Sequence, residues 1–175
     1  ADLQGSFAAA APEGLAFAPS ATARALDTRS SGGARLAAGS ITPVETGAAP
    51  GAEAVLVNLA MVDATAPGYI TADRCSTLTA GPQTKANGNH PTGAGAVANL
   101  SVVPVDPDGR FCIFNHSPVH LVADVQGSFA ADGPYRFVAL PSTRLLDTRP
   151  PVKPSVPGMT SCQSVVHIGD STSVG

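Results

Sequence analysis

The chain has 175 residues, a net charge of −3 and 13% charged residues, against about 25% in an average globular protein. This profile lacks the low hydrophobicity and high charge of a disordered chain, and it gives no positive field that would attract nucleic acid. No apolar run approaches the ~18 residues of a membrane span. Eighteen glycines and 16 prolines indicate dense turns, which favours an all-β protein.

Short β-rich runs predict strands along most of the chain. The first is expected within residues 17–29, while residues 30–50 carry little secondary-structure signal. Both faces of the run at 54–62 are apolar, which predicts a central strand. Further strands are expected at 68–72, 97–105, 110–115 and 119–129, with a flexible loop at 87–95 and an Asp-Pro-Asp-Gly turn at 106–109. Many short strands with glycine- and proline-rich turns favour an antiparallel β-sandwich or jelly roll.

Two motifs occur twice in the chain. Residues 2–7 (DLQGSF) recur as 124–129 (DVQGSF), and residues 17–29 (FAPSATARALDTR) recur as 137–149 (FVALPSTRLLDTR). A repeat this long is a whole domain, because solenoid units span only about 20–50 residues. We therefore expect residues 1–7 as the last strand of a preceding repeat, 8–129 as a complete β-sandwich repeat, 130–150 as the first strand of a second repeat, 151–162 as a proline-rich linker, and 163–175 as the start of another domain.

Three cysteines leave one without a partner inside the chain. Cys75 and Cys112 both lie in the complete repeat, so we expect them to form a disulfide; the alternative is two separate buried thiols. A bridge that closes a loop of about 37 residues stabilises a fold by about 3–4 kcal/mol. It also indicates an oxidising compartment, so the protein is expected to be secreted or at the cell surface. Cys162 is then expected to pair outside this chain or to stay a reactive thiol.

The complete repeat resembles the β-rich repeats of secreted actinobacterial surface proteins. The resemblance rests on LDTR (26–29), AVLVNL (54–59), GYIT (68–71), ANLSVVPV (98–105), DGRFCIFN (108–115) and ADVQGSF (123–129). It covers roughly residues 1–150 and implies association with the cell surface or envelope. It carries over no ligand-binding residues.

Residues 164–175 (SVVHIGDSTSVG) join an apolar run to a Gly-Asp-Ser turn. A strand that ends in a tight turn exposes a serine hydroxyl and directs backbone N–H groups to one point, as a serine nucleophile requires. The segment resembles the first sequence block of the SGNH (GDSL-type) hydrolases, which have an α/β fold. The resemblance implies Ser171 as the nucleophile, with Asp170 as a supporting motif residue; the alternative is a surface turn. The family's Asp-x-x-His base is not found before Gly175, so we expect no turnover from this chain alone.

Other polar and aromatic residues have weaker patterns. Asp27 and Arg29 are expected on one face of a strand, as a structural ion pair or in turn hydrogen bonds that anchor the first strand; the alternative is a ligand site. Tyr69 and Tyr135 could serve as a carbohydrate platform, although 5% aromatic residues and no tryptophan make such a surface thin. His167 is expected to be a packed strand residue. No metal and no cofactor are expected.

Two classes of function follow from these patterns. In the first, the chain is the accessory, envelope- or glycan-associating part of a secreted SGNH-type serine esterase, with cell-envelope polysaccharide or acylated glycan as its partner. In the second, it is a non-catalytic surface module for binding, adhesion or assembly. Unpaired strand edges invite pairing with other chains. The half-repeats at both ends are therefore expected to dock on a neighbouring copy, to pair with each other, or to belong to a longer chain.

Overall fold

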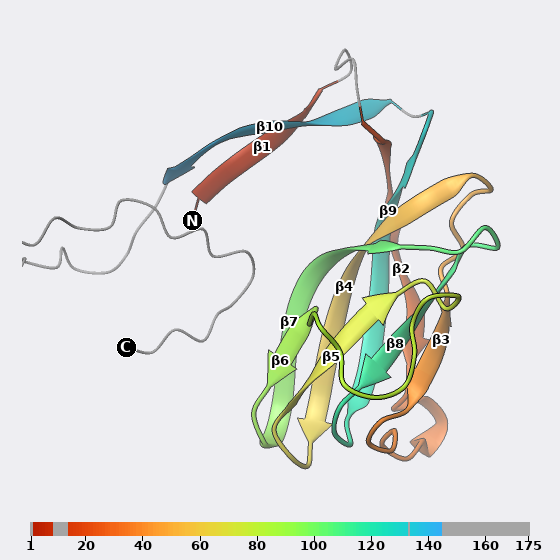
Figure 1. Ribbon diagram of the computed structural model, residues 1–175, viewed down its shortest axis with the longest axis vertical. Helices are drawn as coiled ribbons and strands as arrows, with labels where there is room; N and C mark the ends of the chain where they lie inside the picture. The colour runs from red at the N-terminus through yellow and green to blue at the C-terminus, as the bar shows by residue number, and fades with distance from the viewer. Residues whose placement is uncertain (1, 9–13, 133, 145–175) are drawn as a thin grey trace, which may run out of the picture. The chain divides into compact units, whose positions relative to one another are not determined.

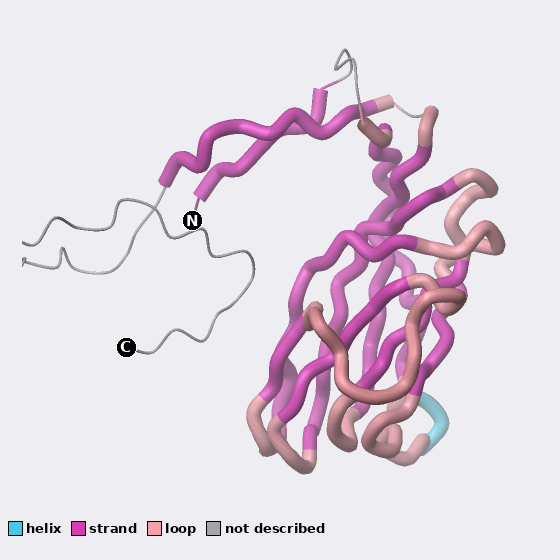
Figure 2. The backbone as a smooth tube through the Cα atoms, in the orientation of Figure 1, coloured by secondary structure: helices cyan, strands magenta, loops and turns pink. Residues whose placement is uncertain are grey.

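A computed structural model describes residues 2–8, 14–132 and 134–144 of the chain. The chain divides into two units, Phe7–Phe137 and a second unit of Ala1–Ser6 with Val138–Gly175. Strands dominate the described residues of both units, and the helical structure among these residues is one short 3-10 turn, η1 (Ser30–Gly32) (Figure 2). The all-β prediction is confirmed.

The larger unit is a sandwich of two antiparallel sheets that lie face to face (Figure 1). The larger sheet has the order β1-β10-β2-β9-β4-β7, in which β1 is Asp2–Ala8 and β10 is Tyr135–Arg144, and the smaller sheet has the order β3-β8-β5-β6. The strands of the larger sheet in this unit are β2 (Ala16–Asp27), β9 (His120–Ala130), β4 (Ala52–Ala64) and β7 (Gly93–Pro104). Those of the smaller sheet are β3 (Ile41–Glu45), β8 (Arg110–Asn115), β5 (Gly68–Asp73) and β6 (Gly88–His90).

The core fills the space between the two sheets. β4 lies between β9 and β7, as its two apolar faces predict. Its inward side chains alternate along the strand, and each lies at or near full burial: Val55, Val57, Leu59 and Met61. They meet side chains of the opposite sheet that are equally buried: Val44, Ile70, Phe111 and Ile113. Each such side chain stabilises the fold by about 1.5–3 kcal/mol relative to an exposed one.

The two strands that the sequence did not reveal are the edges of the smaller sheet. β3 falls in the segment without signal, and β6 falls in the segment expected to be a flexible loop, which also contains the first residues of β7. β3 carries Pro43, a residue that cannot donate to a ladder and is tolerated at sheet edges. The expectation of a flexible loop at 87–95 was therefore wrong in part, because Gly88 and His90 are buried strand residues.

Side-chain packing explains two residues of the repeated motif DVQGSF in β9. Gly127 faces Phe17 of β2, and a Cβ at this position would lie 2.6 Å from the Phe17 ring. The Phe17 ring in turn lies against Phe129, with 4.9 Å between ring centroids. The glycine and the two aromatic rings of the repeated motifs therefore form one contact between the first and last strands of the sandwich.

In the smaller unit, β1 (Asp2–Ala8) lies beside β10 (Tyr135–Arg144), and the two strands run in opposite directions (Figure 1). β1 carries the motif of β9, and β10 carries the motif of β2. The same two motifs are neighbours in the larger unit, where β2 pairs with β9. Pairing of the half-repeats with each other, one of the three arrangements expected, is present in the structure.

Candidate ligand-binding site

Three aromatic rings lie together on the outer face of the smaller sheet. Tyr69 stands on β5, and Phe114 stands on β8, where it is the register partner of Thr71. His116 follows β8, and its backbone N–H donates to the Tyr69 carbonyl at 3.0 Å. The rings of Tyr69 and His116 are stacked, with 4.9 Å between centroids and 25° between planes. The ring centroids of Tyr69 and Phe114 are 6.1 Å apart.

These rings line a cavity of about 410 Å³. Its other lining residues are small or rigid and come from two separate segments: Ala38 and Gly39 before β3, and Gly81 and Pro82 in the loop between β5 and β6. We call this cavity with its seven lining residues the aromatic cradle. None of the seven carries a formal charge at neutral pH when histidine is neutral.

A buried asparagine holds the first side of the cradle in place. Asn115 is fully buried on β8 and points to the inside of the sandwich. Its amide nitrogen donates to the carbonyls of Ala37 (2.8 Å) and Ser117 (3.1 Å), and its side-chain oxygen accepts a hydrogen bond from the Ser40 hydroxyl (2.7 Å). The N–H of Gly39 donates to the Asn115 carbonyl. One side chain therefore fixes the segment 37–40 against the end of β8.

The disulfide holds the second side of the cradle. Cys75 and Cys112 are bonded, as the sequence predicts. Cys112 lies on the outer face of β8, so the bridge attaches the loop of residues 74–87 to the smaller sheet, and this loop crosses in front of β5 and β8 (Figure 1). Outward-facing residues under the loop are buried, including Thr71, whose hydroxyl donates to the Lys85 carbonyl at 2.6 Å.

Polar groups remain available at the rim of the cradle. The Tyr69 hydroxyl oxygen accepts a hydrogen bond from the Gln83 N–H at 3.3 Å, which leaves its own proton to donate. His116 is exposed, and its ring nitrogens make no hydrogen bond with the part of the chain that the structure describes. The arrangement therefore offers an apolar aromatic floor with hydrogen-bonding groups beside it, which is the composition of a small-molecule site.

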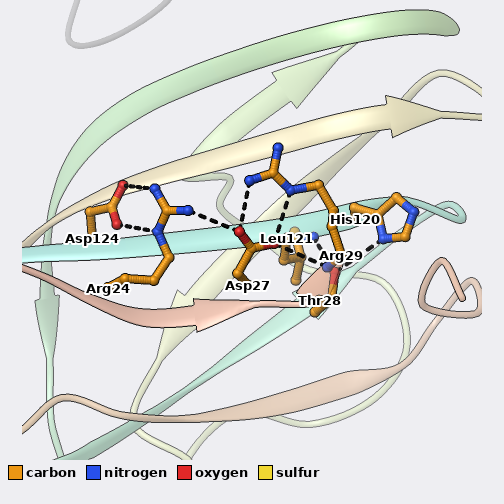
Figure 3. Close-up of polar contacts among 7 residues, drawn as sticks. All are labelled: Arg24, Asp27, Thr28, Arg29, His120, Leu121 and Asp124. Carbon is orange, nitrogen blue, oxygen red and sulfur yellow. Dashed lines mark hydrogen bonds and ion pairs between the residues drawn. The ribbon is translucent and has the colours of Figure 1, made fainter. Parts of the chain in front are cut away.

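A second polar cluster lies where β2 and β9 meet, and it satisfies itself (Figure 3). Arg24 donates to both carboxylate oxygens of Asp124, at 2.6 and 3.1 Å, and to Asp27 at 2.9 Å. Asp27 also accepts the side chain and the backbone N–H of Arg29. The Arg29 guanidinium holds the pKa of Asp27 well below its usual range. The expected structural ion pair is present, although β2 ends at Asp27, so the pair spans a turn and not a strand face.

A buried serine–histidine pair is placed for structure. Ser117 and His90 are 4% and 5% exposed, and the Ser117 hydroxyl donates to the Ala66 carbonyl at 3.2 Å. Burial lowers the pKa of His90. The Ser117 hydroxyl also lies 3.5 Å from His90 Nε2. A catalytic serine must be reachable by substrate, whereas both members of this pair are buried.

The sequence-predicted residues are distributed as follows. Cys75 and Cys112 are joined; Tyr69 lines the cradle, while Tyr135 lies on β10 with 43% of its surface exposed. Ser171 and Asp170, like His167, lie outside the described residues. Sequence reasoning missed Phe114 and His116 as site residues. The available signal was strand alternation, because residues 112, 114 and 116 share one face of a strand.

Comparisons with protein families, curated proteins and solved structures found no match for this chain. Among the described residues, no helix is long and apolar enough to span a membrane. The functional assignment consequently rests on the geometry of the chain's own residues, and the aromatic cradle is the strongest candidate site that they form.

Proposed function

We propose that the sandwich of residues 14–136 is an extracytoplasmic glycan-binding module, and that it serves as the accessory part of a secreted SGNH-type serine esterase. The observation that carries the proposal is the aromatic cradle, since aromatic rings with hydrogen-bonding groups at their edge are suited to sugars, which have apolar faces and polar rims. The disulfide supports an oxidising compartment, because such bridges are rare in reducing cytosol.

The strand order supports the same proposal by analogy. The eight strands β2–β9 divide into sheets of order β2-β9-β4-β7 and β3-β8-β5-β6, which is the arrangement of a jelly roll. Jelly rolls occur in lectin domains as well as in capsids and cupins. Fold alone does not define function. The strand order is therefore supporting evidence for glycan binding, and the aromatic cradle remains the main observation.

Affinity electrophoresis tests the binding role. The purified chain is run through gels that contain neutral, acetylated or acidic polysaccharides, with serum albumin as the reference for mobility. Retardation by at least one polysaccharide supports a glycan-binding module. Unchanged mobility in every gel, together with no retention on isolated cell envelopes, would refute it and favour the alternative of an adhesion or assembly module.

The esterase part of the proposal rests on the Gly-Asp-Ser block and is tested separately. In the natural protein, intact mass and peptide mapping establish whether sequence with an Asp-x-x-His motif follows Gly175. If it does, we expect Ser171→Ala to abolish hydrolysis of 4-nitrophenyl acetate, because a serine nucleophile has no substitute in this mechanism. Unchanged hydrolysis in that variant would rule out Ser171 as the nucleophile.

A further inference from the structure

The cradle differs in its charge from the cavity that is lined by Arg35 and Asp63. A cavity of about 320 Å³ is lined by Arg35 and Asp63, where the Arg35 Nε donates to the Asp63 carbonyl at 2.6 Å. Such a site is suited to charged or strongly polar groups. The cradle contains no carboxylate, ammonium or guanidinium group. A charged ligand there would lose its hydration without gaining a counter-ion, which is costly.

The cradle also has the size of a small ligand site. Its volume of about 410 Å³ lies at the lower end of the roughly 300–1,000 Å³ typical of small-molecule pockets. Its two sides come from separate segments, 38–39 and 81–82. The rings of Tyr69 and His116 form the accessible floor, and the Phe114 ring, which is only 3% exposed, lies beside Tyr69.

The floor has the chemistry to hold one face of a sugar ring. The C–H groups on a pyranose face are apolar, so packing them on aromatic rings removes apolar surface from water. The Tyr69 hydroxyl can donate to a sugar oxygen, since it already accepts from the Gln83 N–H. The exposed His116 ring can accept or donate at either nitrogen, depending on its tautomer.

From these contacts we infer that the aromatic cradle binds a single uncharged sugar unit, stacked on its rings and hydrogen-bonded by Tyr69 and His116. The inference rests on the proposed glycan-binding function and specifies its site and ligand class. An uncharged unit is preferred over a uronic acid or a phosphorylated sugar because the seven lining residues offer no cation. The two sides of the cradle are both anchored to β8, one by Asn115 and one by the disulfide, so the site is preformed.

Isothermal titration tests the ligand class with defined probes. The folded chain is titrated with neutral hexasaccharides of glucose, mannose, xylose and galactose, and with hexagalacturonate as the charged counterpart of the last. We expect saturable binding of at least one neutral hexasaccharide and at least tenfold weaker binding of hexagalacturonate than of the galactose hexamer or the best neutral probe. Stronger binding of hexagalacturonate would overturn the inference.

Variants locate the site. His116→Ala removes an exposed ring, so it is expected to fold normally and to weaken binding of the neutral probe about fivefold or more, in keeping with the loss of a stacked ring and a hydrogen bond. Tyr69→Phe keeps the floor and removes only the hydroxyl, and it should weaken binding by about threefold or more. Tyr135→Ala is the matched control, because Tyr135 is an exposed aromatic residue outside the cradle. The affinity of this variant for the neutral probe should stay within twofold of the wild-type value. Circular dichroism and thermal unfolding verify the fold of each variant.

The two levels of the proposal fail in different ways. If the chain binds no polysaccharide in gels and no oligosaccharide in solution, the glycan-binding function itself is refuted. If it binds a glycan but His116→Ala and Tyr69→Phe leave the affinity unchanged in folded protein, the function stands and the cradle is not its site.

Discussion

The disulfide between Cys75 and Cys112 is predicted to make a large contribution to the stability of the sandwich. The perturbation is the double variant Cys75→Ala/Cys112→Ala, compared with the oxidised protein. Both proteins carry Cys162→Ser, so that a third thiol cannot exchange with the bridge. Removing both sulfurs avoids leaving a single thiol at Cys112, a position that is only 6% exposed.

The magnitude follows from the length of the closed loop. The two cysteines are 37 residues apart, and the chain-entropy relation then gives a loss of about 4 kcal/mol in the free energy of unfolding. For a sandwich of this size that corresponds to a fall in melting temperature on the order of 10–20 °C. The fold should survive, because its core lies between the sheets and the bridge lies on the outer face of β8.

The assay is urea-induced unfolding followed by circular dichroism, with the free energy extrapolated to zero denaturant. We expect a lower midpoint and a similar dependence on denaturant. A difference below about 1 kcal/mol would refute the reasoning, because the 37-residue loop would then be no less free in the unfolded state with the bridge than without it. Binding of the best neutral hexasaccharide should also weaken in the double variant, since the bridge holds one side of the cradle.

Three further predictions concern single side chains. Asn115→Ala leaves several buried hydrogen-bonding groups unpaired and should destabilise the protein by about 3 kcal/mol in urea, whereas the exposed Asn89→Ala should change stability by less than about 0.5 kcal/mol. Gly127→Ala places a Cβ 2.6 Å from the Phe17 ring and 2.7 Å from a backbone carbonyl, so a loss of about 1–3 kcal/mol is expected; equal stability would mean that β2 and β9 separate at no cost. Because the pKa of Asp27 is lowered in the folded state, its carboxylate stabilises the fold at pH values above the unfolded pKa of about 3.9. This stabilisation is lost as pH falls toward the folded pKa. The stability gap between wild type and Asp27→Asn should therefore narrow as pH is lowered from 5 to 2, and a gap that widens would contradict the ion-pair explanation.

The strands that the sequence predicted are those with a strong burial pattern. The inner face of the run at 54–62 is apolar because it packs against the opposite sheet, and β4 lies between β9 and β7 within its own sheet. On its outer face Leu56, Asn58 and Ala60 are partly exposed. The turn at 106–109 was also readable, since Gly109 adopts a φ of +80° and its N–H donates to the Asp106 carbonyl. In both cases the local pattern and the final environment agree, which is when sequence reasoning succeeds.

The cradle could not be predicted because no single segment contains it. Its residues come from the segment before β3, from β5, from the loop between β5 and β6, and from the end of β8. The short edge strands β3 and β6 had to be known before these segments could be placed, and edge strands carry the weakest pattern. Tyr69 was a candidate from its residue type, and strand alternation places residues 114 and 116 on one face. That this face lies beside Tyr69 became visible only with the register of β5 on β8.

The pairing of β1 with β10 makes a prediction about register. In the larger unit Ser128 of β9 pairs with Ala18 of β2. The repeated motifs align these residues with Ser6 of β1 and Val138 of β10. If the same interaction is used twice, Ser6→Cys and Val138→Cys should cross-link within one chain under mild oxidation or with a short bis-thiol reagent. Because a slip of one residue turns side chains to the other face of a sheet, Ser6→Cys with Ala139→Cys is the matched control and should react much more slowly. Equal rates for the two pairs would show that the motifs specify adjacency without register, and the smaller unit would then not repeat the β9–β2 contact of the larger one.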